Sequence, residues 1–296
     1  MAPSLVSDYA FEHCKARAMG RVHSVYATSM NVDVNGFLLH VGSDLAPLSC
    51  LGMTIAPGDM ENLLSCVKRG DRAVFNNGLM RLYGRYGIGE IEIRPARVCS
   101  CSVPPLGVGA LQELGPTVFD ALDEFGLPAL TGLPDCARSK RALSELSRYA
   151  SICARAASDG GVAHQVKDSA ARRALIDAVE YLVGRGLGLT PSGDDILCGF
   201  GCGLTFLYGK IWPQGCSYYR DVVAEAIPGK TTAVSEAYLK AMIDAYANAD
   251  YLDILDALAT GNMDALPALF ETTLSVGHTS GADGLLGFAA AFCCLL

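Results

Sequence analysis

The sequence predicts an α+β protein in which an N-terminal antiparallel β-sheet or barrel domain is followed by a mainly α-helical domain. Two Asn-Gly pairs between β-rich segments predict the sheet, and apolar residues at three- and four-residue spacing predict the helices. Pro104-Pro105 stands between the two patterns, where proline stops a strand and resists a helix. We therefore expect a β-rich domain over residues 1–104 and a helical domain over residues 105–296.

Hairpins are predicted at Asn35-Gly36 and Asn77-Gly78, because Asn-Gly between β-rich runs is the strongest short-range hairpin signal. Val22–Met30, rich in Val, Tyr, Thr and Ser, and the alternating segment Glu90–Arg94 add further β structure. The runs that flank the two turns are Val32–Val34, Phe37–Val41, Ala73–Phe75 and Leu79–Tyr83.

The later part of the chain has helical periodicity. Two apolar runs, Ile196–Tyr208 and Leu285–Leu296, are shorter than the roughly 20 residues of a membrane-spanning helix, so we expect buried helices and no membrane association. Pro267 falls in the first turn of its predicted helix, where proline is tolerated. The periodic segments are Ala137–Ala157, Ser169–Val183, Thr232–Ala247 and Asp264–Val276.

Composition limits the classes of function. Hydrophobic residues make up 51% of the 296 residues and charged residues 18%, which is ample for a buried core. The net charge of −8 argues against a nucleic-acid partner, so an anionic substrate needs a local binding device. The 12 cysteines have neither CxxC nor zinc-ligand spacing, and Met1–Met19 lacks the apolar stretch of a signal peptide. We expect reduced thiols in a cytoplasmic protein.

One nine-residue pattern, S-G-x-D-x-L-x-G-F, occurs twice, at Ser192–Phe200 and at Ser280–Phe288. In each copy a serine precedes an apolar helix and an aspartate follows three positions later, which predicts a capping box. The glycine after each serine, Gly193 or Gly281, allows another group to approach the backbone closely. A structural alternative is that the repeat reflects only two well-capped core helices.

The segments before the two helix starts favour anion binding. Gly188 and Thr190 precede the first copy, and His278 and Thr279 precede the second. Free N–H groups and the helix dipole at a helix N-terminus attract a phosphate or a carboxylate. We therefore predict that the two starts lie together and line one pocket.

The acidic pair Asp194-Asp195 has two interpretations that the sequence leaves open. The two carboxylates could hold a magnesium ion that neutralises a phosphate. Alternatively, Asp195 caps the helix while Asp194 orients a substrate amide. His278 is the best candidate for acid–base chemistry, because imidazole titrates near neutral pH.

A third polar segment follows Pro228. Gly229-Lys230-Thr231 resembles the end of a P-loop, but Ala224 stands where that motif needs glycine, and the preceding residues look helical. A Walker nucleotide site is therefore not expected. Lys230 still supplies a cation near another helix start. The neighbouring hydroxyls are those of Thr231, Thr232 and Ser235.

Three segments together resemble the signature blocks of the AllH subunit family of oxamate carbamoyltransferase. They are Gly188–Asp195, Lys230–Ser235 and Gly277–Asp283, in the order that the family has. The resemblance implies phosphorolysis of oxalurate, or a related ureido acid, to oxamate and carbamoyl phosphate in anaerobic purine and allantoin breakdown. It also implies two partner subunits, one of them similar to acyl-CoA synthetases. The chain lacks the Ser-x-Arg-Thr-Arg motif of aspartate and ornithine carbamoyltransferases, so their mechanism does not transfer.

The candidate site combines the repeat with these blocks. Magnesium at Asp194 and Asp195 is the single cofactor considered. Two other functions stay open: a non-catalytic anion-binding or scaffolding subunit, and a metal-dependent hydrolase using the same two aspartates. Candidate catalytic residues are His278, Asp194 and Asp195. Candidate substrate- and phosphate-binding residues are Gly188, Thr190, Ser192, Gly193, Lys230, Thr231, Thr232, Ser235, Thr279, Ser280, Gly281 and Asp283.

Overall fold

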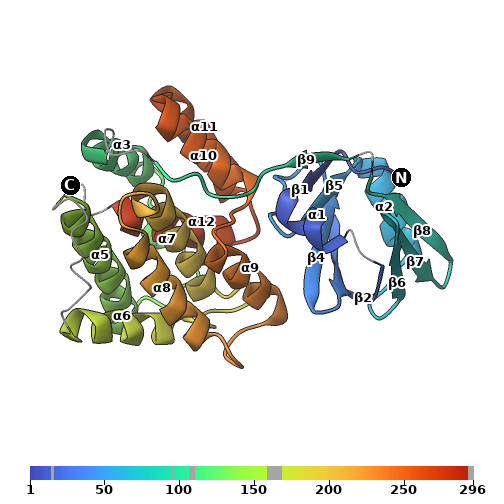
Figure 1. Cartoon of the computed structure of the whole chain (residues 1–296), viewed down its shortest axis with the longest axis horizontal. Coiled ribbons are helices and arrows are strands. Elements are labelled where there is room, and N and C mark those ends of the chain that lie inside the picture. The colour runs from blue at the N-terminus through green and yellow to red at the C-terminus, as the bar shows by residue number, and fades with distance from the viewer. Residues whose placement is uncertain (15–16, 95, 107–110, 159–168, 293–296) are drawn as a thin grey trace. The chain divides into compact units, whose positions relative to one another are not determined.

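A computed structural model of the chain describes residues 1–14, 17–94, 96–106, 111–158 and 169–292. The chain divides into two compact units (Figure 1). The β unit contains Met1–Ser102 together with Tyr246–Ala249, and the helical unit contains Val103–Ala245 together with Asp250–Leu296. The α+β fold class predicted from the sequence is confirmed.

The β unit is built on one nine-stranded sheet with the strand order β8-β7-β6-β2-β3-β4-β5-β1-β9. Its core is formed by alternate apolar side chains such as Val32, Leu39, Phe75 and Leu82, which have almost no exposed surface. The strands are β1 Leu5–Ser7, β2 Ala18–Val25, β3 Ser29–Val34, β4 Phe37–Ser43, β5 Gly52–Ile55, β6 Arg72–Asn76, β7 Leu79–Gly84, β8 Gly87–Glu92 and β9 Arg97–Cys99.

Both predicted hairpins are confirmed. Asn35-Gly36 joins β3 to β4 and Asn77-Gly78 joins β6 to β7, and all four residues have positive φ, as the tight turns between twisted strands require. The sheet is mixed, because β4 pairs with β5 and β1 with β9 in parallel. Those pairings join strands without a tight turn between them, so no local signal predicts them.

Three details of the β unit differ from the sequence-based expectation. Val22–Met30 is divided between β2 and β3, with a turn closed by the hydrogen bond from Tyr26 N to Ser29 O. Two helices, α1 (Asp8–Cys14) and α2 (Pro57–Cys66), interrupt the strands. The Ser7 hydroxyl accepts a hydrogen bond from the Ala10 amide at the start of α1, and proline opens α2, which are ordinary helix-start signals.

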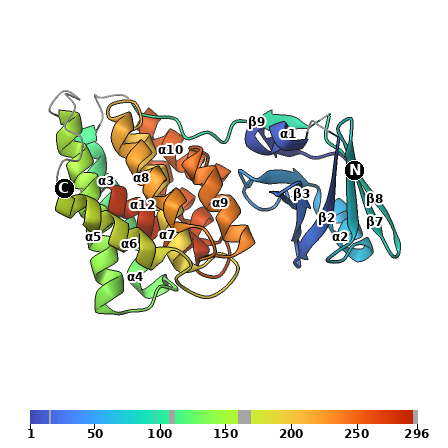
Figure 2. The ribbon, with the colours of Figure 1, turned by 60° about the horizontal axis from the view of Figure 1, so that its bottom comes forward.

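The helical unit is arranged around two helices, α7 and α12. Helix α12 lies beside α7 (Figure 2). Helices α3, α4, α5 and α11 pack against α12, and α6, α8 and α9 pack against α7. No helix in the described part of the chain is long and apolar enough to cross a membrane. The helices are α3 Leu111–Asp123, α4 Leu127–Leu130, α5 Ala137–Ser158, α6 Ser169–Leu182, α7 Ser192–Tyr208, α8 Pro213–Ala226, α9 Ala233–Ile243, α10 Ala249–Thr260, η1 Met263–Ala265, α11 Leu266–Leu274 and α12 Ser280–Phe292.

The predicted helices are found, with different ends. The run after Thr232 stops at Ile243 because Ala245 has a φ of 67° and the amide of Ala247 donates to Cys101 O in the β unit. The segment from Asp264 divides into η1 and α11. The two long apolar runs are the buried helices α7 and α12, with residues 293–296 outside the described part.

Candidate functional site

The two copies of the repeat form the first turns and bodies of α7 and α12. Glycine allows their backbones to touch: a side chain at Gly199 would collide with Gly284 O, and one at Gly287 would collide with Ile196 O. Further along, Gly203 faces Phe288 and Ala291, so the two helices run in the same direction. Parallel helices in close contact bring their N-termini to the same end of the unit.

The two helix starts lie next to each other, as the sequence predicted. The hydroxyls of Thr190 and Ser280, which belong to different copies, are 2.9 Å apart and hydrogen-bonded. A third segment bridges them at Gly132, where an added Cβ would be 2.5 Å from Ser192 Oγ and 2.9 Å from Thr279 Oγ1. Gly132 therefore leaves room for both hydroxyls, which would have to move if a side chain were added there.

The Lys230–Ser235 block joins the same cluster through Asp194. The carboxylate of Asp194 accepts hydrogen bonds from the Gly184 amide at 2.8 Å, from Ser235 Oγ at 2.7 Å and from Thr231 Oγ1. Burial raises the pKa of Asp194, while the hydrogen bonds from Ser235, Thr231 and Gly184 act in the opposite direction. Asp194 therefore ties the loop before α7 to the start of α9.

The predicted capping boxes are wrong. Helix α7 follows Pro191 as its N-cap residue, without a hydrogen bond from a side chain, and Ser192 is already inside the helix. In α12, the Ser280 hydroxyl bonds Thr190 of the other copy. A side-chain cap does occur at α9, where Thr232 Oγ1 accepts from the Ser235 amide at 3.1 Å.

The aligned aspartates of the two copies, Asp195 and Asp283, each accept hydrogen bonds through one side only. Asp195 is bonded by the hydroxyls of Ser280 and Thr190, and Asp283 Oδ1 by Thr131 Oγ1 and by the Gly132 amide at 3.1 Å. Burial raises the pKa of Asp195 well above its ordinary value, and the negative charge of Asp283 raises it further. The Oδ2 atoms of both carboxylates are buried and have no hydrogen-bond partner.

The predicted site residues divide into an outer and an inner layer. Gly188, Lys230 and His278 are exposed, on the loops before α7, α9 and α12. Positive φ at Gly188 (97°) and at Gly277 (67°), just before His278, allows those loops to turn. Thr190, Asp195, Thr231, Thr232, Thr279 and Ser280 are half-buried, and Ser192, Gly193, Asp194, Ser235, Gly281 and Asp283 are buried.

The sequence analysis missed the residues that complete the cluster from outside the three blocks. Thr131 and Gly132 follow the short helix α4, and Gly184 follows α6. Gly184 has a φ of 70°, and its missing side chain leaves room for Lys230 O. Their only local signal was glycine at a helix end, which is too common to indicate a site.

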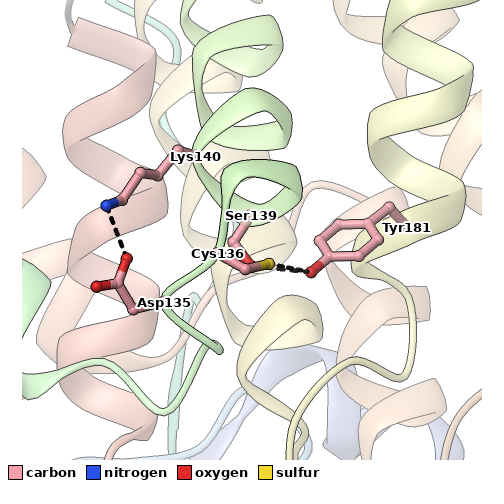
Figure 3. A network of polar contacts seen from close by, with 5 residues as sticks. All are labelled: Asp135, Cys136, Ser139, Lys140 and Tyr181. Atoms are coloured by element: carbon pink, nitrogen blue, oxygen red, sulfur yellow. Dashed lines mark hydrogen bonds and ion pairs between the residues drawn. The ribbon is translucent and has the colours of Figure 1, made fainter.

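A second polar cluster lies at the start of α5, where Cys136 immediately precedes the helix (Figure 3). Its Sγ atom is 3.3 Å from Ser139 Oγ and 3.5 Å from Tyr181 Oη, and these two hydroxyls are 2.9 Å apart. The hydrogen bonds from Ser139 and then Tyr181 lower the pKa of Cys136 to about 6. An exposed thiol with these partners is the most nucleophilic cysteine to be expected in the described part of the chain.

Comparison with known proteins supports the resemblance drawn from the three blocks. The family model for the oxamate carbamoyltransferase subunit AllH matches residues 182–292, which contain all three blocks and the whole α7–α12 segment. Thr131, Gly132 and Cys136 lie outside the matched residues. No solved structure matches the chain significantly.

Proposed function

We propose that this chain is a subunit of a carbamoyltransferase that converts oxalurate, or a related ureido acid, and phosphate to oxamate and carbamoyl phosphate. The observation that carries the proposal is the meeting of the three family blocks at the N-termini of α7, α9 and α12. The blocks are separated in sequence, yet hydrogen bonds such as those of Thr190 with Ser280 and of Thr231 with Asp194 join them.

Phosphate binding is the role that this cluster supports best. The dipoles of α7, α9 and α12 place partial positive charge at their N-termini, although the first-turn amides of Gly193, Ser235 and Gly281 already donate to protein oxygens. Lys230 adds an exposed cation on an otherwise acidic protein. The half-buried hydroxyl of Thr279 is a further donor for phosphate oxygens, whereas the hydroxyl of Thr232 already donates to Leu189 O.

The proposed reaction moves one carbamoyl group. A phosphate oxygen attacks the ureido carbonyl carbon of oxalurate and forms the new C–O bond, and the C–N bond to the oxamate nitrogen breaks. That nitrogen leaves with the bonding electrons and takes up a proton, which yields oxamate and carbamoyl phosphate. Donors at the helix starts stabilise the negative charge that develops on the carbonyl oxygen.

His278 is proposed to transfer the proton to the leaving nitrogen. It lies on the exposed turn just before α12, beside Thr279 of the cluster. Asp194, in contrast, is proposed as a positioning residue, because its carboxylate already accepts three hydrogen bonds from the protein. The chain would act in the anaerobic breakdown of purines and allantoin, together with two partner subunits, one similar to acyl-CoA synthetases.

The test is reconstitution of the reaction. Carbamoyl phosphate formed from oxalurate and phosphate is measured for the isolated chain and for its mixture with the two partner subunits. We expect formation in the mixture, and loss of about 100-fold or more in kcat for His278→Asn, the usual size of a general-acid contribution. His13→Asn, an exposed histidine of α1, is the matched control and keeps the wild-type rate.

Each outcome is informative. A complete mixture that forms no carbamoyl phosphate contradicts the proposed reaction. Wild-type kinetics in His278→Asn contradict only the role of that histidine. If the mixture is active but every substitution in the cluster changes assembly without changing kcat, the chain is instead an anion-binding or scaffolding subunit without chemistry of its own.

A further inference from the structure

Two buried carboxylate oxygens without hydrogen-bond partners belong to the first turns of α7 and α12. Asp283 has no exposed surface, and its Oδ2 atom has no hydrogen-bond partner. Asp195 Oδ2, at the aligned position of the neighbouring helix, is also buried without a partner. A buried acceptor left without a hydrogen bond is unfavourable, and an unpaired buried charge is more so. A ligand that satisfies both oxygens would remove this cost.

The neighbouring hydrogen-bond donors leave both Oδ2 atoms available to such a ligand. The protein donors at this point go elsewhere: Thr131 Oγ1 and the Gly132 amide bond Asp283 Oδ1. Asp195 is already bonded by the hydroxyls of Ser280 and Thr190, and the negative charges of Asp195 and Asp283 repel each other. What is missing is positive charge between the two carboxylates.

The proposed phosphate makes the need for positive charge greater. A phosphate at the starts of α7 and α12 would lie near two carboxylates in the first turns of the same helices. Like charges in a partly buried site repel strongly unless a cation or protons lie between them. Magnesium is commonly held by one or two carboxylates plus the oxygens of a substrate phosphate.

We propose that Asp195 and Asp283 bind a divalent cation of the magnesium class through their Oδ2 atoms, with oxygens of the bound phosphate or carbamoyl phosphate completing its coordination. The inference rests on the proposed function for the phosphate, but the cation site can be measured without turnover. It replaces the pairing of Asp194 with Asp195 considered from the sequence, because Asp194 already accepts three hydrogen bonds.

The ligand set determines how the cation binds. In the described part of the chain no group of three or more His, Cys, Asp or Glu side chains is placed to hold a metal ion. Two carboxylates alone make a weak site, so metal binding depends on the phosphate. The expected behaviour is mutual: the cation strengthens phosphate binding, and phosphate strengthens cation binding by the same factor.

The experiment measures the binding of Mn²⁺ to the full chain. Binding is measured by titration calorimetry and by the paramagnetic resonance signal of free Mn²⁺. We expect one Mn²⁺ per chain, bound at least 10-fold more tightly when inorganic phosphate is present. Asp195→Asn and Asp283→Asn each weaken binding at least 10-fold. Asp264→Asn, which removes an exposed carboxylate of η1, is the matched control and leaves Mn²⁺ affinity unchanged.

The two asparagine variants are expected to fold. Asparagine keeps an oxygen to accept the existing hydrogen bonds and places its amide at the position of the unpartnered Oδ2. Thermal unfolding of each variant checks this. If one variant fails to fold, the wild-type chain supplies the same test. Mn²⁺ and phosphate added together must raise its thermal unfolding midpoint by more than the sum of the shifts that each produces alone.

Three results would overturn the cation site. The first is unchanged Mn²⁺ affinity in both asparagine variants. The second is the absence of a midpoint shift in the wild-type chain. The third is metal-free phosphate binding that strengthens as the pH falls and is indifferent to Mn²⁺, because the carboxylates then share a proton. Mn²⁺ binding as expected, without carbamoyl phosphate formation in any mixture, instead contradicts the proposed reaction and leaves the cation site standing.

Discussion

The starts of α7 and α12 share the pattern S-G-x-D-x-L-x-G-F, yet their side chains have different partners. At the variable position, α7 has Asp194, which accepts from a loop amide and from two hydroxyls of the α9 start. At the same position α12 has Ala282, which is buried and carries no carboxylate. The aligned aspartates also differ, because Asp195 is bonded across to α12 and Asp283 to the Thr131-Gly132 turn.

The difference shows that one local sequence pattern can have two structural roles in the same unit. The shared glycines make both helices fit against each other, which explains why the pattern is repeated. The extra carboxylate of the first copy holds a third segment in place, whereas the second copy has no such segment to hold. Three substitution experiments test this comparison.

The largest effect is expected for Asp194→Ala, which gives the first copy the S-G-A-D sequence of the second. The amide of Gly184 and the hydroxyls of Thr231 and Ser235 would lose their acceptor. Each buried donor left without a partner costs about 1–3 kcal/mol, so the free energy of unfolding should fall by about 3–5 kcal/mol. Urea denaturation measures it. Ser235→Ala, which removes one donor, is the control, and an equal loss in both variants would contradict the three-donor role.

Asp250, a buried carboxylate outside both copies of the repeat, shows how much an unpartnered carboxylate oxygen costs in folding stability. Asp250 of α10 has an Oδ1 atom without a partner, and burial raises its pKa from 3.8 to about 6. The folded state therefore favours the protonated form. The destabilisation of the folded state by ionised Asp250 is absent below about pH 4, grows as the pH rises, and is complete above about pH 6. Its full size is about 3 kcal/mol at 1.36 kcal/mol per pKa unit.

Urea denaturation of the wild type and of Asp250→Asn from pH 4 to pH 8 measures this effect. Relative to the variant, the wild type should lose stability between about pH 4 and pH 6 and then change little. A stability difference that is constant with pH would show that folding does not change the pKa of Asp250. The carboxylates of the two copies could then not be compared with it.

The smallest effect concerns a third helix start, that of α5, where a thiol precedes the helix and no carboxylate lies in its first turn. The alkylation rate of Cys136 with iodoacetamide should rise with a midpoint near its pKa of about 6. The buried thiols of Cys14 and Cys101, whose pKa is raised by burial to about 12, should stay unmodified at neutral pH.

Removing one partner of Cys136 refines this result. Ser139→Ala should raise the midpoint by about one unit, because the thiolate loses its largest source of stabilisation. Tyr181→Phe should raise it by a similar or smaller amount. The site of alkylation is read by peptide mass spectrometry. A wild-type midpoint near 8.5, the ordinary value for a free cysteine, would show that the hydroxyl contacts do not act on the thiol.

Much of the fold followed from local patterns. The turns at Asn35-Gly36 and Asn77-Gly78 have the positive φ values that this residue pair tolerates, so nearest neighbours were sufficient to predict them. The helices were predicted from apolar periodicity, which depends only on which face must be buried. The start of α9 was predicted as well, but its C-terminal end was not, because the chain after Ile243 pairs its backbone at Ala247 with the distant Cys101.

The residues of the candidate site could be predicted from the sequence, but the hydrogen bonds between them could not. The pairing of α7 with α12 follows from glycines placed where the sequence repeats them, and the three blocks were recognisable as a set. The hydrogen-bond partners were not, because Thr231 is 37 positions from Asp194, and Thr131 is 152 positions from Asp283. A local capping rule predicted an amide partner for Asp195, and the structure instead gives it the hydroxyls of Ser280 and Thr190.

The sequence by itself therefore determined the two hairpins, the helices with clear apolar periodicity, where glycine permits a turn or a close approach, and which polar residues stand at the starts of those helices. These properties depend on backbone dihedral preferences and on the burial of one apolar face. Only the tertiary structure decided that Asp194 is satisfied while Asp195 and Asp283 each keep a free oxygen. A buried carboxylate takes the strongest donors within reach, and which donors are within reach depends on how distant segments pack.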